Sequence, residues 1–517
     1  MTSRPVLRRW IAAGCALAAV LSTALTASLV RRPAGEAAGN PAIAGAGPDG
    51  PVGPVERACD GVPLRPSDDL QRIIDAHAPG TAYCFSAGTY RLVEPLRPKS
   101  GDALIGRAGA VVSGSKVLTG WRRGDRGWST TGFLPAAPGT HGECRAGMPL
   151  CGATEDIFAD KQRLTRVSSP ADVIGGTFHA DYATNTITIG DDPAQHLLEQ
   201  AVAPSLVRTT ADDVTLANLV FEQAANEAQT AAVESRQVTP QQAGSGWHIL
   251  HNEVRLNHGA GLGIADGAVV SGNFVHDQGQ LGVGAWGTGS VVDGNEISSN
   301  GVAGYSPDWE AGGVKSWLTD GQSVTHNYVH DNAGPGLWSD GGNIRTRYAA
   351  NRISGNWGAG IQYEISYDAT IEDNEITGNG RRPKGWAWDA GIQIQSSGGT
   401  GRIEITGNVV RGNANAITLI DSGGRAGEAP APHGPHIVRN VSVHDNRITL
   451  TDGQLTGAVQ DIGDPAIYRD RNNRFEKNTY RLASRTAAYF AWNDTELDWA
   501  GWRAQGQDAG STVTRTR

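Results

Sequence analysis

A short motif recurs through the middle of the chain: an asparagine, then a variable residue, then an apolar one. It begins at eight positions, namely Asn252, Asn273, Asn295, Asn327, Asn351, Asn374, Asn408 and Asn446. The usual interval is about 21 to 24 residues, and the longer intervals contain insertions. Such an interval accommodates three short strands and three turns. The pattern therefore predicts an all-β fold, a right-handed parallel β-helix.

The repeated asparagines are typical of turns in which stacked side-chain amides bind one another and the backbone is left-handed. A second asparagine follows the first by five residues at Asn257, Asn300, Asn332, Asn356, Asn379 and Asn413. His276 and His330 share one position of the repeat. We interpret them as turn residues rather than metal ligands, because no further ligands cluster around them in the sequence.

The flanking segments fit a β-helix of about residues 206–480 that carries the functional face. Residues 59–114 would form its N-terminal cap and first coils. There, an amphipathic helix over 67–77, with Ser67 as N-cap, would cover the open end. Residues 115–205 lack the asparagine repeat but contain strand-like runs such as 185–190. They predict an inserted, β-rich, sandwich-like subdomain. Residues 481–517 would be a separate C-terminal segment.

The N-terminus is typical of an exported protein. Three arginines precede an uncharged run over 10–30, so residues 1–32 predict a signal peptide, although the run is also long enough for a membrane anchor. Residues 33–58, rich in Ala, Gly and Pro, predict a flexible linker. The bulk of the chain is therefore expected to be secreted or extracytoplasmic.

The cysteines agree with an oxidising compartment. One of the five lies in the exported run, and the other four are Cys59, Cys84, Cys144 and Cys151. An even set predicts two disulfides. Sequence proximity favours Cys59–Cys84 and Cys144–Cys151, although four cysteines allow three pairings. The net charge of −9 in 517 residues indicates no nucleic-acid partner and no anionic membrane surface.

Counting from the repeat asparagines aligns four strands. Gly336 and Asp340 follow Asn327 by 9 and 13 residues, and Gly360 and Glu364 follow Asn351 by the same numbers. With insertions after Asn295 and Asn374, two further strands align. Alternate residues of a strand face opposite sides, so eight residues face outward: Lys315, Trp338, Gln362 and Gln393 in one column, and Trp317, Asp340, Glu364 and Gln395 in the other.

Asp340 and Glu364 are therefore expected on adjacent strands, about 4.8 Å apart. Retaining glycosidases hold their two carboxyl groups about 5–5.5 Å apart, whereas inverting ones need about 6.5–9.5 Å. The expected spacing favours retention. Outward carboxylates of a β-helix are more often solvated surface, and an acidic pair can also bind Ca²⁺. No calcium motif is present, so we expect no cofactor or metal.

Two insertions flank these strands, at 302–310 and 381–389. They carry a third carboxylate, Glu310, and the aromatic residues Trp309, Trp386 and Trp388. With Trp317 and Trp338, these side chains would line a pocket closed at both ends that suits a sugar, which has apolar faces and a rim of hydroxyls.

Three segments carry a resemblance to a known family: "WEAGGVK" (309–315), "GLWSD" (336–340) and "GIQYEIS" (360–366). They resemble the bacterial β-helix β-xylosidases of the pectate-lyase-like superfamily, which are retaining glycoside hydrolases with a subdomain inserted early in the helix. The resemblance implies that Asp340 is the nucleophile and Glu364 the acid/base, with Glu310 as a supporting residue. Ser339 and the Trp-rich loop at 381–389 depart from the family pattern.

The sequence thus predicts a retaining hydrolase acting on a terminal sugar, with Lys315 and Glu310 orienting sugar hydroxyls or tuning the catalytic pair. Two alternatives stay open. A lyase or epimerase of uronate polymers could use Lys315 as its base, although no arginine joins the outward columns to bind a substrate carboxylate. A non-catalytic carbohydrate-binding surface protein would use the same face without turnover.

Overall fold

The computed structural model describes residues 45–235, 243–382, 385–423, 425 and 433–515. The predicted signal peptide or anchor, residues 1–32, lies outside the described residues. Within them, no helix is both long and apolar enough to cross a membrane.

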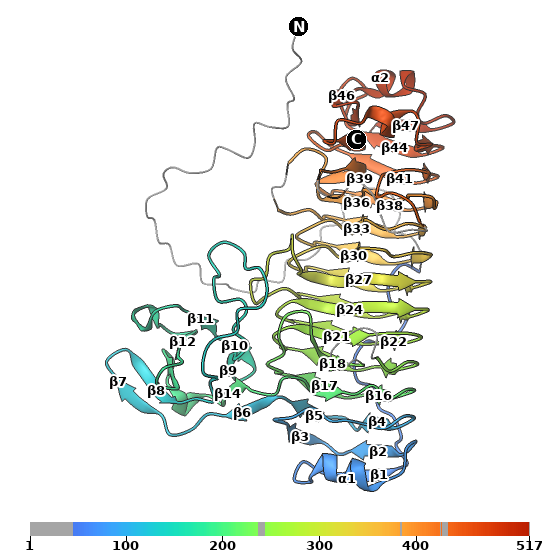
Figure 1. The fold of residues 1–517 in the computed structure, drawn as a ribbon. Helices are drawn as coiled ribbons and strands as arrows, with labels where there is room; N and C mark the ends of the chain where they lie inside the picture. The colour runs from blue at the N-terminus through green and yellow to red at the C-terminus, as the bar shows by residue number, and fades with distance from the viewer. Residues whose placement is uncertain (1–44, 236–242, 383–384, 424, 426–432, 516–517) are drawn as a thin grey trace.

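The strands form a parallel β-helix, as predicted, in which successive coils stack along one axis (Figure 1). Within the described residues most coils contribute one strand to each of three sheets, whereas the first coils lack a strand in sheet 1. Sheet 1 contains β15 (Val207–Arg208), β18 (Ala231–Glu234), β21 (Ala260–Ile264), β24 (Leu281–Thr288), β27 (Gly312–Asp320), β30 (Leu337–Asp340), β33 (Ile361–Glu364), β36 (Ala390–Gln395), β39 (Asn415–Asp421), β42 (Thr456–Gln460), β45 (Phe490–Trp492) and β46 (Thr495–Leu497).

Sheets 2 and 3 complete each coil. Sheet 2 contains β1 (Val62–Leu64), β2 (Ala82–Phe85), β4 (Ala103–Gly106), β16 (Thr215–Ala217), β19 (His248–Leu250), β22 (Val269–Ser271), β25 (Val291–Asp293), β28 (Ser323–Thr325), β31 (Thr346–Ala349), β34 (Ala369–Glu372), β37 (Ile403–Thr406), β40 (Val441–His444) and β43 (Arg474–Glu476). Sheet 3 contains β3 (Gly88–Arg91), β5 (Ala110–Ser113), β17 (Val220–Glu222), β20 (Glu253–Arg255), β23 (Phe274–His276), β26 (Glu296–Ser298), β29 (Tyr328–His330), β32 (Arg352–Ser354), β35 (Glu375–Thr377), β38 (Val409–Arg411), β41 (Arg447–Leu450), β44 (Thr479–Leu482) and β47 (Thr512–Arg515).

Two asparagine ladders hold the coils in register, as predicted. The side-chain Oδ1 of Asn351 accepts hydrogen bonds from both the backbone N–H and the amide of Asn327, each at 3.0 Å. Asn356 and Asn332 repeat this arrangement in the second ladder. The left-handed residue is the one before the asparagine rather than the asparagine itself, for example Ala350 with φ 53°. The asparagine side chain thus forms hydrogen bonds at the turn in which the preceding residue is left-handed.

The two histidines of the repeat are the last residues of strands β23 and β29 rather than turn residues. His330 contacts Asp331 through Nδ1 (2.9 Å) and Glu296 of the previous coil through Nε2 (3.3 Å). His276 makes the corresponding pair of contacts. Among the described residues no cluster of side chains could hold a metal ion.

Helix α1 (Leu70–Ala76) covers the first coil, with Leu70 and Ile74 buried. Its N-cap is Asp69 rather than the expected Ser67, because the Asp69 carboxylate accepts from the N–H of Arg72. At the other end, the segment expected to be separate after residue 480 completes the last coil with β45, β46 and β47. It also supplies α2 (Trp499–Ala504), whose Trp502 is fully buried.

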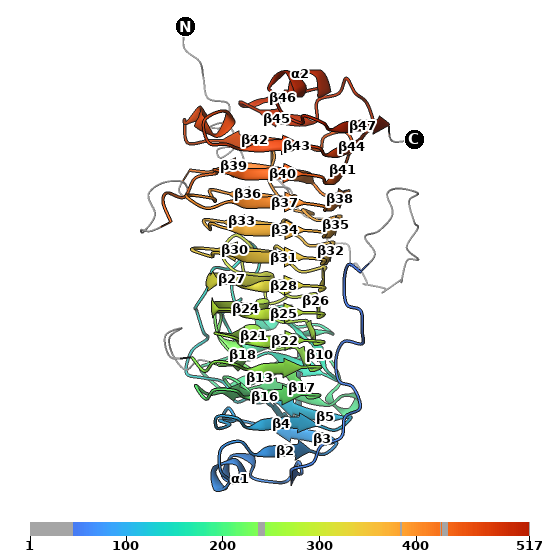
Figure 2. The ribbon, with the colours of Figure 1, turned by 90° about the vertical axis from the view of Figure 1, so that its right-hand side faces the viewer.

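The segment predicted as a linker differs from that expectation over residues 45–58. Gly47 and Gly53 donate backbone hydrogen bonds to the carbonyls of Ala350 and Gly272, and Val55 donates to the Asn218 side chain. This segment therefore runs along the flank of the β-helix, as the dark blue trace in Figure 2 shows. Because glycine has no side chain and proline has a compact one, this segment can lie close to the exposed carbonyl groups of the turns.

The inserted subdomain projects beside the early coils (Figure 1). Its strands are β6 (Ser115–Val117), β7 (Arg122–Gly124), β8 (Gly127–Thr131), β9 (Ile157–Ala159), β10 (Gln162–Arg163), β11 (Thr165–Arg166), β12 (Thr177–Asp181), β13 (Thr186–Ile189) and β14 (Leu198–Ala201). Both favoured disulfides, Cys59–Cys84 and Cys144–Cys151, are confirmed. The second closes a subdomain loop that contacts the 302–310 insertion.

Candidate active site

Sheet 1 brings the two candidate carboxylates together in the predicted register. Asp340 of β30 pairs with Glu364 of β33, and Glu364 pairs with Gln395 of β36. In the other column Lys315, Trp338, Gln362 and Gln393 are successive partners. The alternation holds because the inward residues between them, such as Leu337 and Ile361, are fully buried in the core.

Trp317 departs from this register. Pairing of β27 with β30 ends at Ser316, and a Cβ built on Gly341 would lie 3.0 Å from the Trp317 ring. The Trp317 ring thus lies against Gly341, one residue beyond Asp340, because β27 bulges at Trp317 and Leu318, which together oppose the single residue Trp286 of β24. The Trp317 residue is 46% exposed.

Lys315 binds two carboxylates. Its Nζ lies 2.9 Å from Asp340 Oδ2 and 2.8 Å from Glu310 Oε1, and 4.1 Å above the Trp338 ring. Glu310 also accepts a hydrogen bond from the amide of Gln280. The count from the repeat asparagines did not include Gln280. The lysine thus fixes the orientation of Asp340 and connects it to the 302–310 insertion.

Glu364 is almost fully buried, at 2% exposure. Its Oε2 accepts from Trp338 Nε1 (3.1 Å) and Gln362 Nε2 (2.8 Å). Burial raises the pKa of Glu364 and the charge of Asp340 raises it further, while Arg425 and the two hydrogen bonds act against them. Burial is the largest cause of the raised pKa, ahead of the neighbouring carboxylate.

Arg425 is a site residue that sequence reasoning missed. Its Nε lies 2.8 Å from Glu364 Oε1. Only residues of the strands were aligned, and Arg425 belongs to the segment after β39. The signal was the interval of 38 residues between Asn408 and Asn446, which marks an insertion at the other edge of sheet 1.

The two glutamines beyond Glu364 stabilise neighbouring segments. Gln393 accepts from the backbone N–H of Asp389 and donates to Gln395, which donates to Ser422. Both glutamines are buried. They support the ends of the loops instead of facing an open pocket.

The two insertions are joined to each other. Arg382 lies 2.9 Å from Asp308 of the first insertion and 2.9 Å from Asp389 of its own. Trp309 packs with Tyr305 against the disulfide loop. The structure therefore holds both loops in a fixed relation on one edge of sheet 1.

The predicted aromatic wall is only partly present. Trp386 and Trp388 pack against Ile420 and Leu455 of later coils, and Trp386 Nε1 donates to Glu496. Both rings therefore pack on apolar residues of these later coils rather than beside the carboxylates. The pocket is accordingly not centred between the insertions.

A cavity of about 390 Å³ instead adjoins the carboxylates on the side of the earlier coils. Glu310, Lys315 and Trp317 form the end nearest Asp340, and the cavity continues over β24, β21 and β18. A volume of this size is typical of small-molecule sites. It combines aromatic rings with carboxylates, as a sugar site requires.

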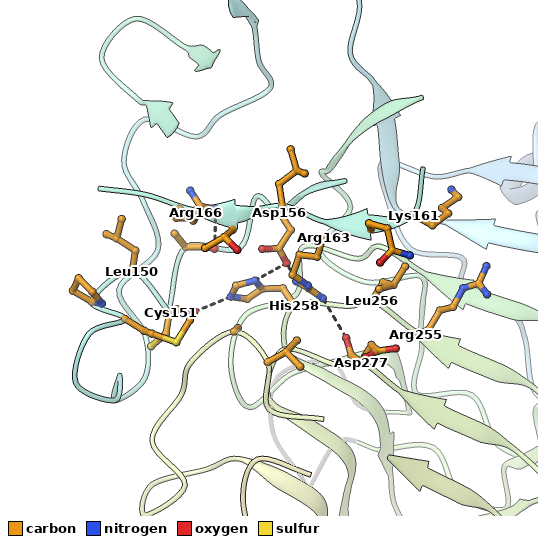
Figure 3. A pocket seen from close by; sticks show the side chains of 18 of the residues that line it. Leu150, Cys151, Asp156, Lys161, Arg163, Arg166, Arg255, Leu256, His258 and Asp277 are labelled. Carbon is orange, nitrogen blue, oxygen red and sulfur yellow. Dashed lines mark hydrogen bonds and ion pairs between the residues drawn. The ribbon is translucent and has the colours of Figure 1, made fainter. Parts of the chain in front are cut away.

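A larger cavity of about 690 Å³ lies between the inserted subdomain and the β-helix (Figure 3). The buried His258 contacts Asp156 (2.9 Å) and the carbonyl of Cys151 (2.8 Å), and burial lowers its pKa to about 3. Arg163 and Arg166 are ion-paired with acidic residues. These contacts join the two parts of the molecule, and no aromatic ring lines the cavity.

Comparisons with known proteins agree on the fold. The chain matches the family described as "Right handed beta helix region" over residues 240–381 and 345–428. The structure of XylC in complex with xylose is similar, with a TM-score of 0.61 and 14% identity, covering 86% of this chain and 82% of that one. The protein is therefore a right-handed parallel β-helix.

Two further solved structures resemble the chain more distantly. One is the catalytic unit of a GH87 α-1,3-glucanase from Streptomyces thermodiastaticus (TM-score 0.44, 13% identity, 92% of this chain and 70% of that one). The other is the A-module of the mannuronan C-5 epimerase AlgE6 from Azotobacter vinelandii (0.40, 13%, 89% and 97%). A search of curated proteins finds no match.

Proposed function

We propose that the protein is a retaining glycoside hydrolase, similar to a β-xylosidase, that acts on neutral poly- or oligosaccharides. The observation that carries this proposal is the pairing of Asp340 with Glu364 on adjacent strands. Strands about 4.8 Å apart suit the short carboxyl separation of retaining enzymes and leave no room for the water that inversion needs. The complex of XylC with xylose, the similar structure with the higher TM-score, accords with this substrate class.

Asp340 would be the nucleophile. Lys315 holds its Oδ2, which leaves Oδ1 to attack the anomeric carbon and form a glycosyl-enzyme. The ammonium keeps the carboxylate oriented.

Glu364 would be the acid and then the base. Because burial and Asp340 raise its pKa, it can carry the proton that the leaving oxygen takes. Its Oε2 is occupied by two buried donors, so Oε1, which Arg425 contacts, is the oxygen that faces the substrate. Once Asp340 is an uncharged ester, its effect on the pKa disappears. Glu364 then ionises more easily and can activate water.

The charges around the pair favour a neutral sugar. Three carboxylates (Glu310, Asp340 and Glu364) face two cations (Lys315 and Arg425), and both cations are already paired. With Glu364 protonated these charges balance, so a uronate would find no unpaired cation among the described residues around the pair. This argues against the lyase and epimerase alternatives, which need a cation for the substrate carboxylate.

The test is a panel of nitrophenyl glycosides, with xylosides expected to react. Proton NMR of the first product should show retained anomeric configuration. An inverted product would exclude Asp340 as nucleophile. Absence of turnover on all neutral glycosides, together with an unsaturated product from uronate polymers, would support a lyase instead.

A further inference from the structure

The column of outward residues on sheet 1 loses its side chains over two consecutive coils. Lys315 of β27 pairs with Gly284 of β24, Gly284 with Gly263 of β21, and Gly263 with Glu234 of β18. On the next coil the column continues with Trp338. Two glycines thus separate Glu234 from Lys315 and hollow the face of the sheet.

These glycines form the floor of the 390 Å³ cavity. A Cβ built on Gly284 would meet only the carbonyl oxygen of Leu262, at 3.9 Å, so the space above it is open. Trp286 and Trp317 line the cavity, as do the small apolar side chains of Ala260 and Leu281. Glu234 lies at the far end with 1% exposure.

The cavity is longer than one sugar ring. From β18 to β27 it crosses three inter-strand steps, about 14 Å at the usual spacing, and these four strands are neighbours in Figure 1. A single pyranosyl unit covers roughly one such step. Asp340 lies one strand beyond β27 and Glu364 one strand further.

The order of the strands sets the direction of a bound chain. The leaving oxygen must lie toward Glu364, so the ring that Asp340 attacks extends the opposite way, toward β27. The open space over Gly284 then lies on the side of the sugar that becomes bound to the enzyme, and it ends over Gly263, where a built Cβ would meet Glu234 Cγ at 3.2 Å.

We propose that this space is a second sugar subsite, which binds the pyranosyl unit attached to the sugar that Asp340 attacks. The proposal rests on the proposed function. The Trp286 and Trp317 rings would contact apolar sugar faces, and Glu234, which is buried and paired with Arg208 (3.0 Å), would close the far end of the subsite. The enzyme would then cleave the bond after the second unit and release a disaccharide, with water supplying the new anomeric hydroxyl and a proton to the leaving chain.

The first experiment uses the wild-type protein. The kcat/KM for nitrophenyl β-xylobioside should exceed that for nitrophenyl β-xyloside by about tenfold or more, the scale of one or two aromatic contacts. Xylobiose should be the first product from xylotetraose. Equal rates on the two glycosides, or xylose as first product, would overturn the subsite while leaving the glycosidase proposal intact. Hydrolysis of neither glycoside would contradict the glycosidase proposal and the subsite with it.

The second experiment fills the space. Gly284 has an ordinary φ, and its Cβ position is open, so Gly284→Leu should fold and project into the cavity. It should lower kcat/KM on the xylobioside about tenfold and leave the xyloside within about twofold. Gly284→Ala, which adds one carbon, is the matched control and should change both little. An equal loss on both glycosides with Gly284→Leu would overturn the proposal.

Discussion

Replacing Glu364 by glutamine tests the acid/base assignment most directly. The amide oxygen can still accept from Trp338 and Gln362, but its NH₂ would then face the guanidinium of Arg425 where Oε1 now lies. The side chain keeps its volume in a site that is 2% exposed, so packing is preserved. What is lost is the transferable proton, which in enzymes contributes about 10²- to 10⁴-fold to the rate.

The loss should depend on the leaving group. Xylotetraose needs a proton in the first step, so its kcat/KM should fall by about 10²- to 10⁴-fold. A dinitrophenyl xyloside releases a stable phenolate, which needs no proton. Its glycosyl-enzyme should therefore form within about tenfold of the wild-type rate. The second step then lacks a base, and added azide should restore turnover by attacking the glycosyl-enzyme directly.

The assay compares kcat/KM on both substrates, with and without azide. Glu372→Gln, an acidic residue that pairs with Arg347 on sheet 2, is the control and should match the wild type. Equal impairment of Glu364→Gln on both substrates would refute the assignment. So would a lack of azide rescue combined with an inverted product.

Three further predictions follow from described contacts. Arg425→Gln removes a cation that lowers the pKa of Glu364, so the alkaline limb of the kcat/KM–pH profile should move to higher pH, and an unchanged limb would argue against their contact. Asn351→Ala removes four buried hydrogen bonds and should lower the free energy of unfolding in urea by about 3–6 kcal/mol, whereas Gln505→Ala, at an exposed position with an ordinary φ, should cost under about 0.5 kcal/mol. The pKa of His330 is raised by Asp331 and Glu296 despite burial, so its stabilisation is complete below its unfolded value near 6.5 and is lost as pH rises through the raised pKa. His330→Gln should therefore cost more stability at about pH 6 than at about pH 9.

The register of the site could be predicted from the sequence because the asparagine repeat is periodic and each strand alternates. Counting residues from Asn327 and Asn351 placed Asp340 beside Glu364 without reference to any contact. The count failed for Trp317, since β27 has one extra residue between Ser316 and Thr319 relative to β24, and this bulge interrupts the alternation.

Residues outside the repeat could not be placed in the same way. Arg425 reaches Glu364 from an insertion, where no period specifies the direction of a side chain. Trp386 and Trp388 lie within an insertion, and the apolar residues on which they pack belong to later coils. The sequence pattern does not indicate which residues these rings contact. Residues 45–58 contact the flank of the β-helix through backbone groups. Because every sequence has these groups, composition could not predict the contacts.

Because of the ladders, the length of a coil does not determine the position of its functional side chains. Asn295 and Asn327 are 32 residues apart and bond at 2.9 Å, and Asn408 and Asn446 are 38 apart and bond at 2.9 and 3.0 Å. Asn327 and Asn351, only 24 apart, bond at 3.0 Å. A loop at one corner can therefore be lengthened, shortened or exchanged while the carboxylates on the sheet keep their places, so that new substrate preferences can arise by changes in corner loops alone.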